Sequence, residues 1–121
     1  MPIHKILVVD DSPTERFAMN ELLSSKGYYV VMAENGEEGI AKSKSEMPDL
    51  ILMDVVMPGM NGYQATRTIS RDEATRSIPV IMCTTKGQET DKIWGMRQGA
   101  HDYMVKPVDG PALLAKIAAL G

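Results

Sequence analysis

The sequence contains the stretch Asp49-Leu50-Ile51-Leu52-Met53-Asp54, followed by Val55-Val56-Met57-Pro58-Gly59. Four apolar residues without alternation favour a strand buried on both faces of a parallel sheet, although a buried helix segment can have the same pattern. The proline and glycine that follow indicate that this strand ends in a loop. Ligands of open α/β sheets collect at the carboxyl ends of the strands. The stretch therefore predicts that Asp54 stands at the functional edge of a central strand.

Four other segments have strand-like patterns, at residues 6–9, 28–33, 79–83 and 103–105. Helical patterns separate them, and the first has clear start signals: Ser12 as N-cap, Pro13 at the first helical position, and Glu15 as capping-box partner. The apolar side of this helix is expected to consist of Phe17, Met19, Leu22 and Leu23. Asn35 predicts the start of a second helix, and three more are expected over about residues 62–71, about 89–98, and from about 109 onward. Five alternations of strand and helix predict an α/β fold with a doubly wound parallel sheet.

The totals fit a single domain over residues 1–121. The net charge of -3 gives no basic surface for nucleic acid, and no apolar run approaches the roughly 20 residues of a membrane span. The strand-like sequence begins near the first residue, so we expect no signal peptide. The single cysteine, Cys83, fits a reducing compartment. We therefore expect a cytoplasmic protein that binds neither nucleic acid nor membrane.

Polar residues follow four of the five predicted strands. They are Asp10 and Asp11 after the first strand, Asp54 after the third, Thr84 at the fourth and Lys106 after the fifth. Carboxylates that are crowded together repel one another, and a hard divalent cation such as Mg²⁺ relieves that repulsion. An ammonium and a hydroxyl beside it can hold a phosphoryl group. The pattern predicts phosphoryl transfer to a carboxylate.

Each of these residues also has a purely structural interpretation. An aspartate after a strand is often a helix cap or a turn residue, and a lysine there can be a solvated charge. Thr84 could be a strand-end hydroxyl bonded to the backbone. The convergence of such residues from four separate strands favours the functional interpretation.

The motifs at this edge resemble those of the receiver domain of two-component response regulators. They are Val8-Val9-Asp10-Asp11-Ser12, Leu52-Met53-Asp54-Val55-Val56-Met57-Pro58-Gly59-Met60-Asn61-Gly62, Thr84-Thr85 and Lys106-Pro107. The resemblance covers essentially the whole chain. It implies a flavodoxin-like (βα)5 fold with a five-stranded parallel sheet in the order 2-1-3-4-5.

The resemblance also implies a role for each site residue. Asp54 would be the phosphoacceptor, and the metal, Mg²⁺ or Mn²⁺, would be held by Asp10, Asp11, Asp54 and the backbone carbonyl of Val56. Thr84 and Lys106 would bind the phosphoryl group. Thr84 and Tyr103 would form the switch, with the Tyr103 ring turning inward when Thr84 moves, and the Lys106-Pro107 bond would be cis.

A finer resemblance, to the regulators of twitching motility driven by type IV pili, lies in residues 10–15, 62–67 and 84–95. It implies a stand-alone response regulator without an output domain, which is phosphorylated by a histidine kinase and is not itself an enzyme. Its downstream protein target would bind the face formed by the fourth helix, fifth strand and fifth helix. Control of twitching motility or a chemotaxis-like process would be its role.

Other functions remain open from the residues alone. The chain could be a docking module that is not phosphorylated, or a phosphate sink. A phosphatase of the haloacid dehalogenase type also phosphorylates a strand-end aspartate, but it needs a second aspartate where this chain has Val56. A flavodoxin-like FMN protein needs a phosphate loop after the first strand, where the acidic pair Asp10 and Asp11 would repel a phosphate.

Overall fold

The computed structural model describes residues 2–121. Strands and helices alternate along this part of the chain. The order is β1 (Lys5–Val9), α1 (Pro13–Ser24), β2 (Tyr29–Ala33), α2 (Gly36–Glu46), β3 (Leu50–Met53), α3 (Gly62–Arg71), β4 (Val80–Thr84), α4 (Glu89–Arg97), β5 (Asp102–Val105) and α5 (Gly110–Leu120). These bounds confirm the predicted elements to within a few residues at each end.

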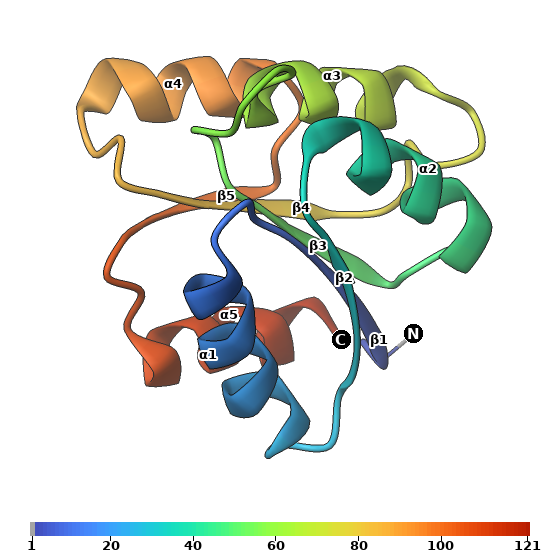
Figure 1. Ribbon diagram of the computed structural model, residues 1–121, viewed down its shortest axis with the longest axis vertical. Helices are drawn as coiled ribbons and strands as arrows, with labels where there is room; N and C mark the ends of the chain where they lie inside the picture. Colours follow the sequence, from blue (N-terminus) through green and yellow to red (C-terminus); the bar gives the residue numbers. More distant parts are fainter. Residues whose placement is uncertain (1) are drawn as a thin grey trace.

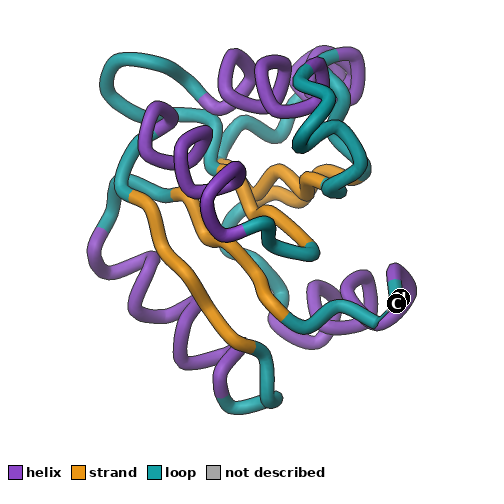
Figure 2. Tube along the Cα trace, turned by 90° about the vertical axis from the view of Figure 1, so that its right-hand side faces the viewer, coloured by secondary structure: helices purple, strands orange, loops and turns teal. Residues whose placement is uncertain are grey.

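The strands form one parallel sheet in the order β2-β1-β3-β4-β5. This order confirms the flavodoxin-like prediction and puts β1, β3 and β4 in the interior of the sheet. Helices α1 and α5 lie on one face, and α2, α3 and α4 cover the other (Figures 1 and 2). Because both faces are covered, β3 is buried along its whole length, as its unbroken apolar run predicts.

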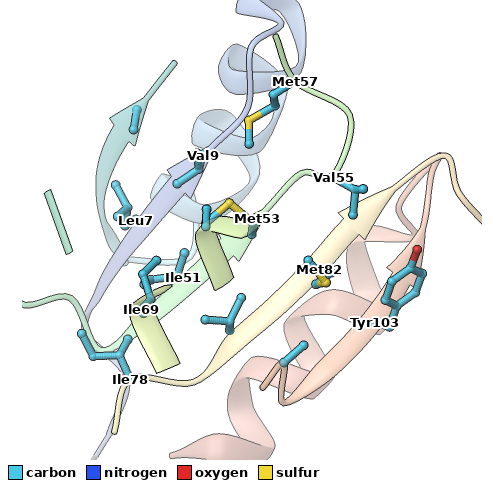
Figure 3. Close-up of a cluster of buried hydrophobic side chains, with 14 residues drawn as sticks. Leu7, Val9, Ile51, Met53, Val55, Met57, Ile69, Ile78, Met82 and Tyr103 are labelled. Carbon is cyan, nitrogen blue, oxygen red and sulfur yellow. The ribbon is translucent and has the colours of Figure 1, made fainter. Parts of the chain in front are cut away.

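Alternate residues of each strand supply two separate cores. On the α2–α4 face, Leu7, Ile51 and Met82 pack with Ile69 of α3 and Tyr103 of β5 (Figure 3). On the α1–α5 face, the strand side chains that point the other way pack against helix residues. The strand residues are Ile6, Val8, Leu52 and Ile81, and the helix residues are Leu23, Leu113 and Ile117. The two cores hold the carboxyl ends of the strands in a fixed relative position.

Two details of α1 differ from the sequence-based prediction. Phe17, expected on the apolar side of the helix, points to solvent with 66% of its surface exposed, whereas Leu23 is fully buried. The capping box is only half formed. Ser12 Oγ accepts a hydrogen bond from Glu15 N at 3.2 Å, but Ser12 N donates to Asp10 Oδ1 at 2.9 Å instead of to Glu15. The Glu15 carboxylate is therefore not used as a cap.

The helices of residues 2–121 are all too short or too polar to serve as membrane spans.

Candidate functional site

The site residues are brought together by backbone hydrogen bonds that continue the sheet beyond the strand ends. Asp54 N donates to the Val9 carbonyl at 3.0 Å, and Lys106 N donates to the Thr84 carbonyl at 2.8 Å. Asp10 N donates in the same way to β2, at the Ala33 carbonyl, at 3.1 Å. Each polar residue is thus held one step past a buried strand, where its side chain can turn toward its neighbours.

Three carboxylates gather at this edge. One oxygen each from Asp10, Asp11 and Asp54 lies within 4.8 Å of the others. Asp10 and Asp54 are buried, with 6% and 7% of their surface exposed, and Asp11 is exposed. One oxygen of each buried carboxylate is fixed by a backbone N–H, since Asp54 Oδ1 accepts from Val55 N at 2.8 Å and Asp10 Oδ1 accepts from Ser12 N. The structure therefore brings together all three acids that the sequence predicted.

Lys106 lies among these acids. Its Nζ donates to Asp10 Oδ2 at 2.8 Å and lies 3.6 Å from Asp54 Oδ2 and 3.9 Å from Glu15 Oε2. Burial lowers the pKa of Lys106, but the hydrogen bond to Asp10 and the charge of Asp54 outweigh it and raise the pKa overall. Lys106 is consequently a permanent cation within reach of two carboxylates. The Lys106-Pro107 peptide bond that precedes α5 is cis.

The charge of Asp54 is disfavoured by its surroundings. Burial raises the pKa of Asp54 to about 6, the nearby Lys106 ammonium opposes this increase, and Asp10 adds to it. The folded-state pKa thus lies above the usual value of 3.8, so the folded protein binds a proton more tightly than the unfolded chain. The Asp54 contribution to stability is greatest when it is protonated, and it is lost as the pH rises from about 4 through 6.

Replacing Asp54 by Asn is therefore expected to stabilise the metal-free protein by about 2 kcal/mol at pH 7.5, because the amide removes a buried charge. At pH 4.5 most of this gain should disappear, since Asp54 of the folded protein is then largely protonated and no longer places a charge in the interior. Urea unfolding in the presence of a chelator, at both pH values, measures the difference. An Asn variant that is no more stable than the wild type at pH 7.5 would contradict this electrostatic description.

Thr84 and Tyr103 are placed between the acids and α4. Thr84 is fully buried, and its Oγ1 accepts a hydrogen bond from Lys86 N at 3.3 Å. The Tyr103 ring points inward, with 7% of its surface exposed, and its Oη donates to the Lys86 carbonyl at 2.6 Å (Figure 3). Both side chains thus bind the backbone of the same loop residue, Lys86, which connects β4 to α4.

Tyr63 and Gly95 complete the environment of Tyr103. The Tyr63 Oη donates to the Asp91 carbonyl of α4 at 3.2 Å and lies 3.4 Å from the Tyr103 Oη. A Cβ atom at Gly95 would lie 3.0 Å from two carbon atoms of the Tyr103 ring, so only glycine leaves full space for the inward ring. Sequence reasoning singled out neither residue, because their role depends on packing between distant elements.

The acidic site fits a divalent metal ion. Of the three carboxylates, Asp10 and Asp54 lie beside the partly buried Lys106, and the excess of negative charge would be neutralised by a hard cation with oxygen ligands. Within residues 2–121, no hydrogen bond is made to the Val56 carbonyl, whose residue is 55% exposed beside Asp54. That carbonyl is consequently free to act as a further ligand, in addition to Asp10, Asp11 and Asp54.

Two residues at the site had no predicted role in it. The sequence pattern predicts only a cap at Glu15, yet its Oε2 lies 3.9 Å from Lys106 Nζ. Arg16 donates from Nη1 to the Asp10 carbonyl at 2.6 Å, and its Nη2 lies 3.3 Å from Glu34 Oε1. The only sign of their role in the sequence is that both lie in the first turn of the helix that follows Asp10. That position does not determine which way their side chains turn.

Comparisons with known proteins agree with this arrangement. The family model of the response regulator receiver domain matches residues 6–118. Protein PilH of Pseudomonas aeruginosa is 55% identical over 116 residues, which cover 96% of each chain. Longer transcriptional regulators also match, and the chain spans about half of their length.

Solved structures show the same fold and an occupied metal site in a relative. The chemotaxis protein CheY4 of Vibrio cholerae superposes with a TM-score of 0.91 at 31% identity and covers 98% of this chain and 99% of its own. The receiver domain of the sensor histidine kinase PA1611 of P. aeruginosa is 30% identical and superposes with a TM-score of 0.89, covering 97% of this chain and 96% of its own. That structure has a magnesium ion coordinated in the active site cleft. The chain described here belongs to the response regulator receiver domain family, whose members are signalling domains of two-component phosphorelays.

Proposed function

We propose that Asp54 accepts a phosphoryl group from a phosphohistidine of a histidine kinase, and that the phosphorylated chain signals through contacts with another protein. The observation that carries this proposal is the position of Lys106. Its ammonium lies 2.8 Å from Asp10 and 3.6 Å from Asp54, so that one cation can bind a phosphoryl oxygen beside the acceptor carboxylate.

The transfer itself needs little from the protein except position and charge. A carboxylate oxygen of Asp54 forms a bond to phosphorus while the bond from phosphorus to the histidine nitrogen breaks, and the nitrogen keeps the electron pair. Asp54 Oδ1 is held by Val55 N, which fixes the orientation of the carboxylate. Because the pKa of Asp54 is about 6, the carboxylate is mainly ionised and nucleophilic above that pH.

A divalent ion, Mg²⁺ or Mn²⁺, would be held by Asp10, Asp11, Asp54 and the Val56 carbonyl. When bound, it supplies positive charge to the phosphoryl oxygens in the transition state. Lys106 would then release Asp10 and donate to a phosphoryl oxygen, and Thr84 Oγ1 would exchange its bond from Lys86 N for a bond to the phosphoryl group. The chain would thus assist its own phosphorylation and dephosphorylation without acting as an enzyme on another substrate.

The signal would travel from Thr84 to α4 through Lys86 and Tyr103, which share hydrogen bonds with the β4–α4 loop. The surface beyond them exposes four apolar side chains to solvent: Ile93, Trp94, Met96 and Val105. Exposed apolar residues grouped on α4 and β5 suit a protein partner. We therefore place the downstream target on the face formed by α4, β5 and α5.

The biological setting rests on similarity. PilH is 55% identical over nearly its whole length, which supports a role in twitching motility or a chemotaxis-like process within the cytoplasm. One observation favours the docking module as a second candidate. Ile93, Trp94 and Met96 of α4 are exposed side chains that a partner can contact whether or not Asp54 is modified.

Incubation with acetyl phosphate, followed by measurement of the intact mass, separates these candidates. The proposed function predicts a gain of one phosphoryl group with Mg²⁺ present and no gain with excess chelator, because the three carboxylates repel the donor when no cation is bound. An established receiver domain treated in parallel controls for the activity of the donor. No gain under conditions that modify the control would favour the docking module.

A further inference from the structure

We infer that Glu15 determines which phosphodonors the site accepts, by disfavouring small donors that carry two negative charges. This inference rests on the proposed function, since it concerns the same transfer to Asp54. It assigns a role to a residue outside the expected set of metal ligands and phosphoryl-binding residues.

The side chain of Glu15 faces the site because the backbone N–H that it would bind in a capping box already donates to Asp10. In a complete capping box the carboxylate of Glu15 would bind Ser12 N. Here Asp10 Oδ1 binds that N–H at 2.9 Å, and the Glu15 Oε2 lies 3.9 Å from Lys106 Nζ instead. The hydrogen bond from Ser12 N to Asp10 thus leaves the Glu15 side chain without a capping role.

Glu15 lies at the mouth of the site. It lines a small cavity together with Asp54 and Lys106, and it also lines an open groove of about 260 Å³ between α1 and the segment that follows β5. Its side chain is 51% exposed, in contrast to the buried carboxylates of Asp10 and Asp54. A donor that reaches Asp54 through this opening passes close to the Glu15 carboxylate.

The charge of Glu15 remains uncompensated when a donor arrives. It does not belong to the cluster of Asp10, Asp11 and Asp54, which a metal ion would neutralise. Arg16, the nearest guanidinium in sequence, is bound to Glu34 and to the Asp10 carbonyl. Lys106 is the cation that Glu15 can approach, and a phosphoryl group at Asp54 needs the same cation.

Two small donors of different charge test this role. In acetyl phosphate, a dianion near neutral pH, the bond from phosphorus to the acetate oxygen breaks and acetate leaves with the electron pair. Phosphoramidate carries one unit less negative charge because its nitrogen is protonated, and its phosphorus–nitrogen bond breaks to release ammonia. In both cases the new bond joins phosphorus to an Asp54 oxygen. A phosphohistidine also has a nitrogen leaving group, and protonation of its ring lowers its negative charge by one unit in the same way. Glu15 would therefore repel it less than the dianion of an acyl phosphate.

The experiment compares Glu15→Gln with the wild type in initial rates of phosphoryl uptake, using each donor at saturating Mg²⁺ and low ionic strength. Removal of one charge near the entrance is expected to raise the rate with acetyl phosphate about fivefold and the rate with phosphoramidate about twofold. The change in the ratio of the two rates should shrink in high salt, because salt screens exposed charges.

Glu21→Gln is the matched control. Glu21 is an exposed residue of the same helix, so this variant changes the net charge equally and leaves the site untouched. Three results would each overturn the inference: unchanged rates in Glu15→Gln, an equal rise with both donors, or the same shift in the rate ratio in Glu21→Gln. The proposed function would still stand in these cases, provided that Asp54 takes up the phosphoryl group. Absence of uptake in every protein, wild type included, would instead refute the proposed function.

Discussion

The Asp54→Asn variant takes up no phosphoryl group in the presence of Mg²⁺ and acetyl phosphate, if Asp54 is the acceptor. The amide of Asn has no ionised oxygen to attack phosphorus, and Asp10, the other buried carboxylate beside Lys106, has both of its oxygens in hydrogen bonds, from Ser12 N and Lys106 Nζ. We expect the rate to fall below about one hundredth of the wild-type rate. Intact mass measured over time gives this rate directly.

The stability of the same variant makes this test specific. Because Asp54→Asn should be more stable than the wild type above pH 6, loss of uptake cannot be ascribed to unfolding. Asp72→Asn is a suitable control, since Asp72 is a partly exposed residue after α3 that pairs with Lys44 far from the site. Substantial uptake by Asp54→Asn, or its loss in Asp72→Asn, would show that another residue accepts the phosphoryl group.

Lys106→Met should reduce the rate of transfer about 10²- to 10³-fold, which is the typical effect of removing one charged donor to a transition state. Methionine keeps much of the aliphatic stem of lysine, so the change removes the ammonium and little of the packing. The rate of uptake from acetyl phosphate at saturating Mg²⁺ measures this loss.

Part of that loss comes from the protonation of Asp54. The Lys106 charge lowers the pKa of Asp54, and without it the pKa rises above 6, so that less carboxylate is ionised near neutral pH. Measurement at pH 8.5 as well as pH 7 separates this contribution, since Asp54 is more fully ionised at the higher pH.

The matched control for Lys106→Met is Lys116→Met. Lys116 makes an ion pair of 2.7 Å with Asp102 but lies on α5, outside the site. Its substitution should leave the transfer rate unchanged. A Lys106→Met variant that is as fast as Lys116→Met at both pH values would mean that the ammonium does not act on the phosphoryl group.

Much of the fold could be predicted from local sequence patterns. The unbroken apolar run before Asp54 predicted a strand buried on both faces, and Ser12 with Pro13 predicted the start of α1. The convergence of Asp10, Asp54 and Lys106 followed from the rule that parallel strands present their carboxyl ends at one edge. The strand order, in contrast, came from the family resemblance, because periodicity does not determine which strands are neighbours.

Side-chain directions could not be predicted in the same way. Phe17 matched the apolar period of α1 but points to solvent, and Glu15 matched a capping box but faces Lys106. For Glu15 the reason is that Asp10 Oδ1 binds the Ser12 N–H that a complete capping box would use. Tyr63 and Gly95 show the same limit, since their contacts with Tyr103 join α3, α4 and β5.

Chemical trapping of the modified residue tests the central claim most directly. Borohydride reduces an aspartyl phosphate to homoserine, and peptide mass spectrometry then locates the converted residue. After treatment with Mg²⁺ and acetyl phosphate, we predict homoserine at position 54 and at no other aspartate. Conversion at Asp10 or Asp11, or a phosphoryl group that borohydride does not remove, would contradict the assignment of Asp54 as the acceptor.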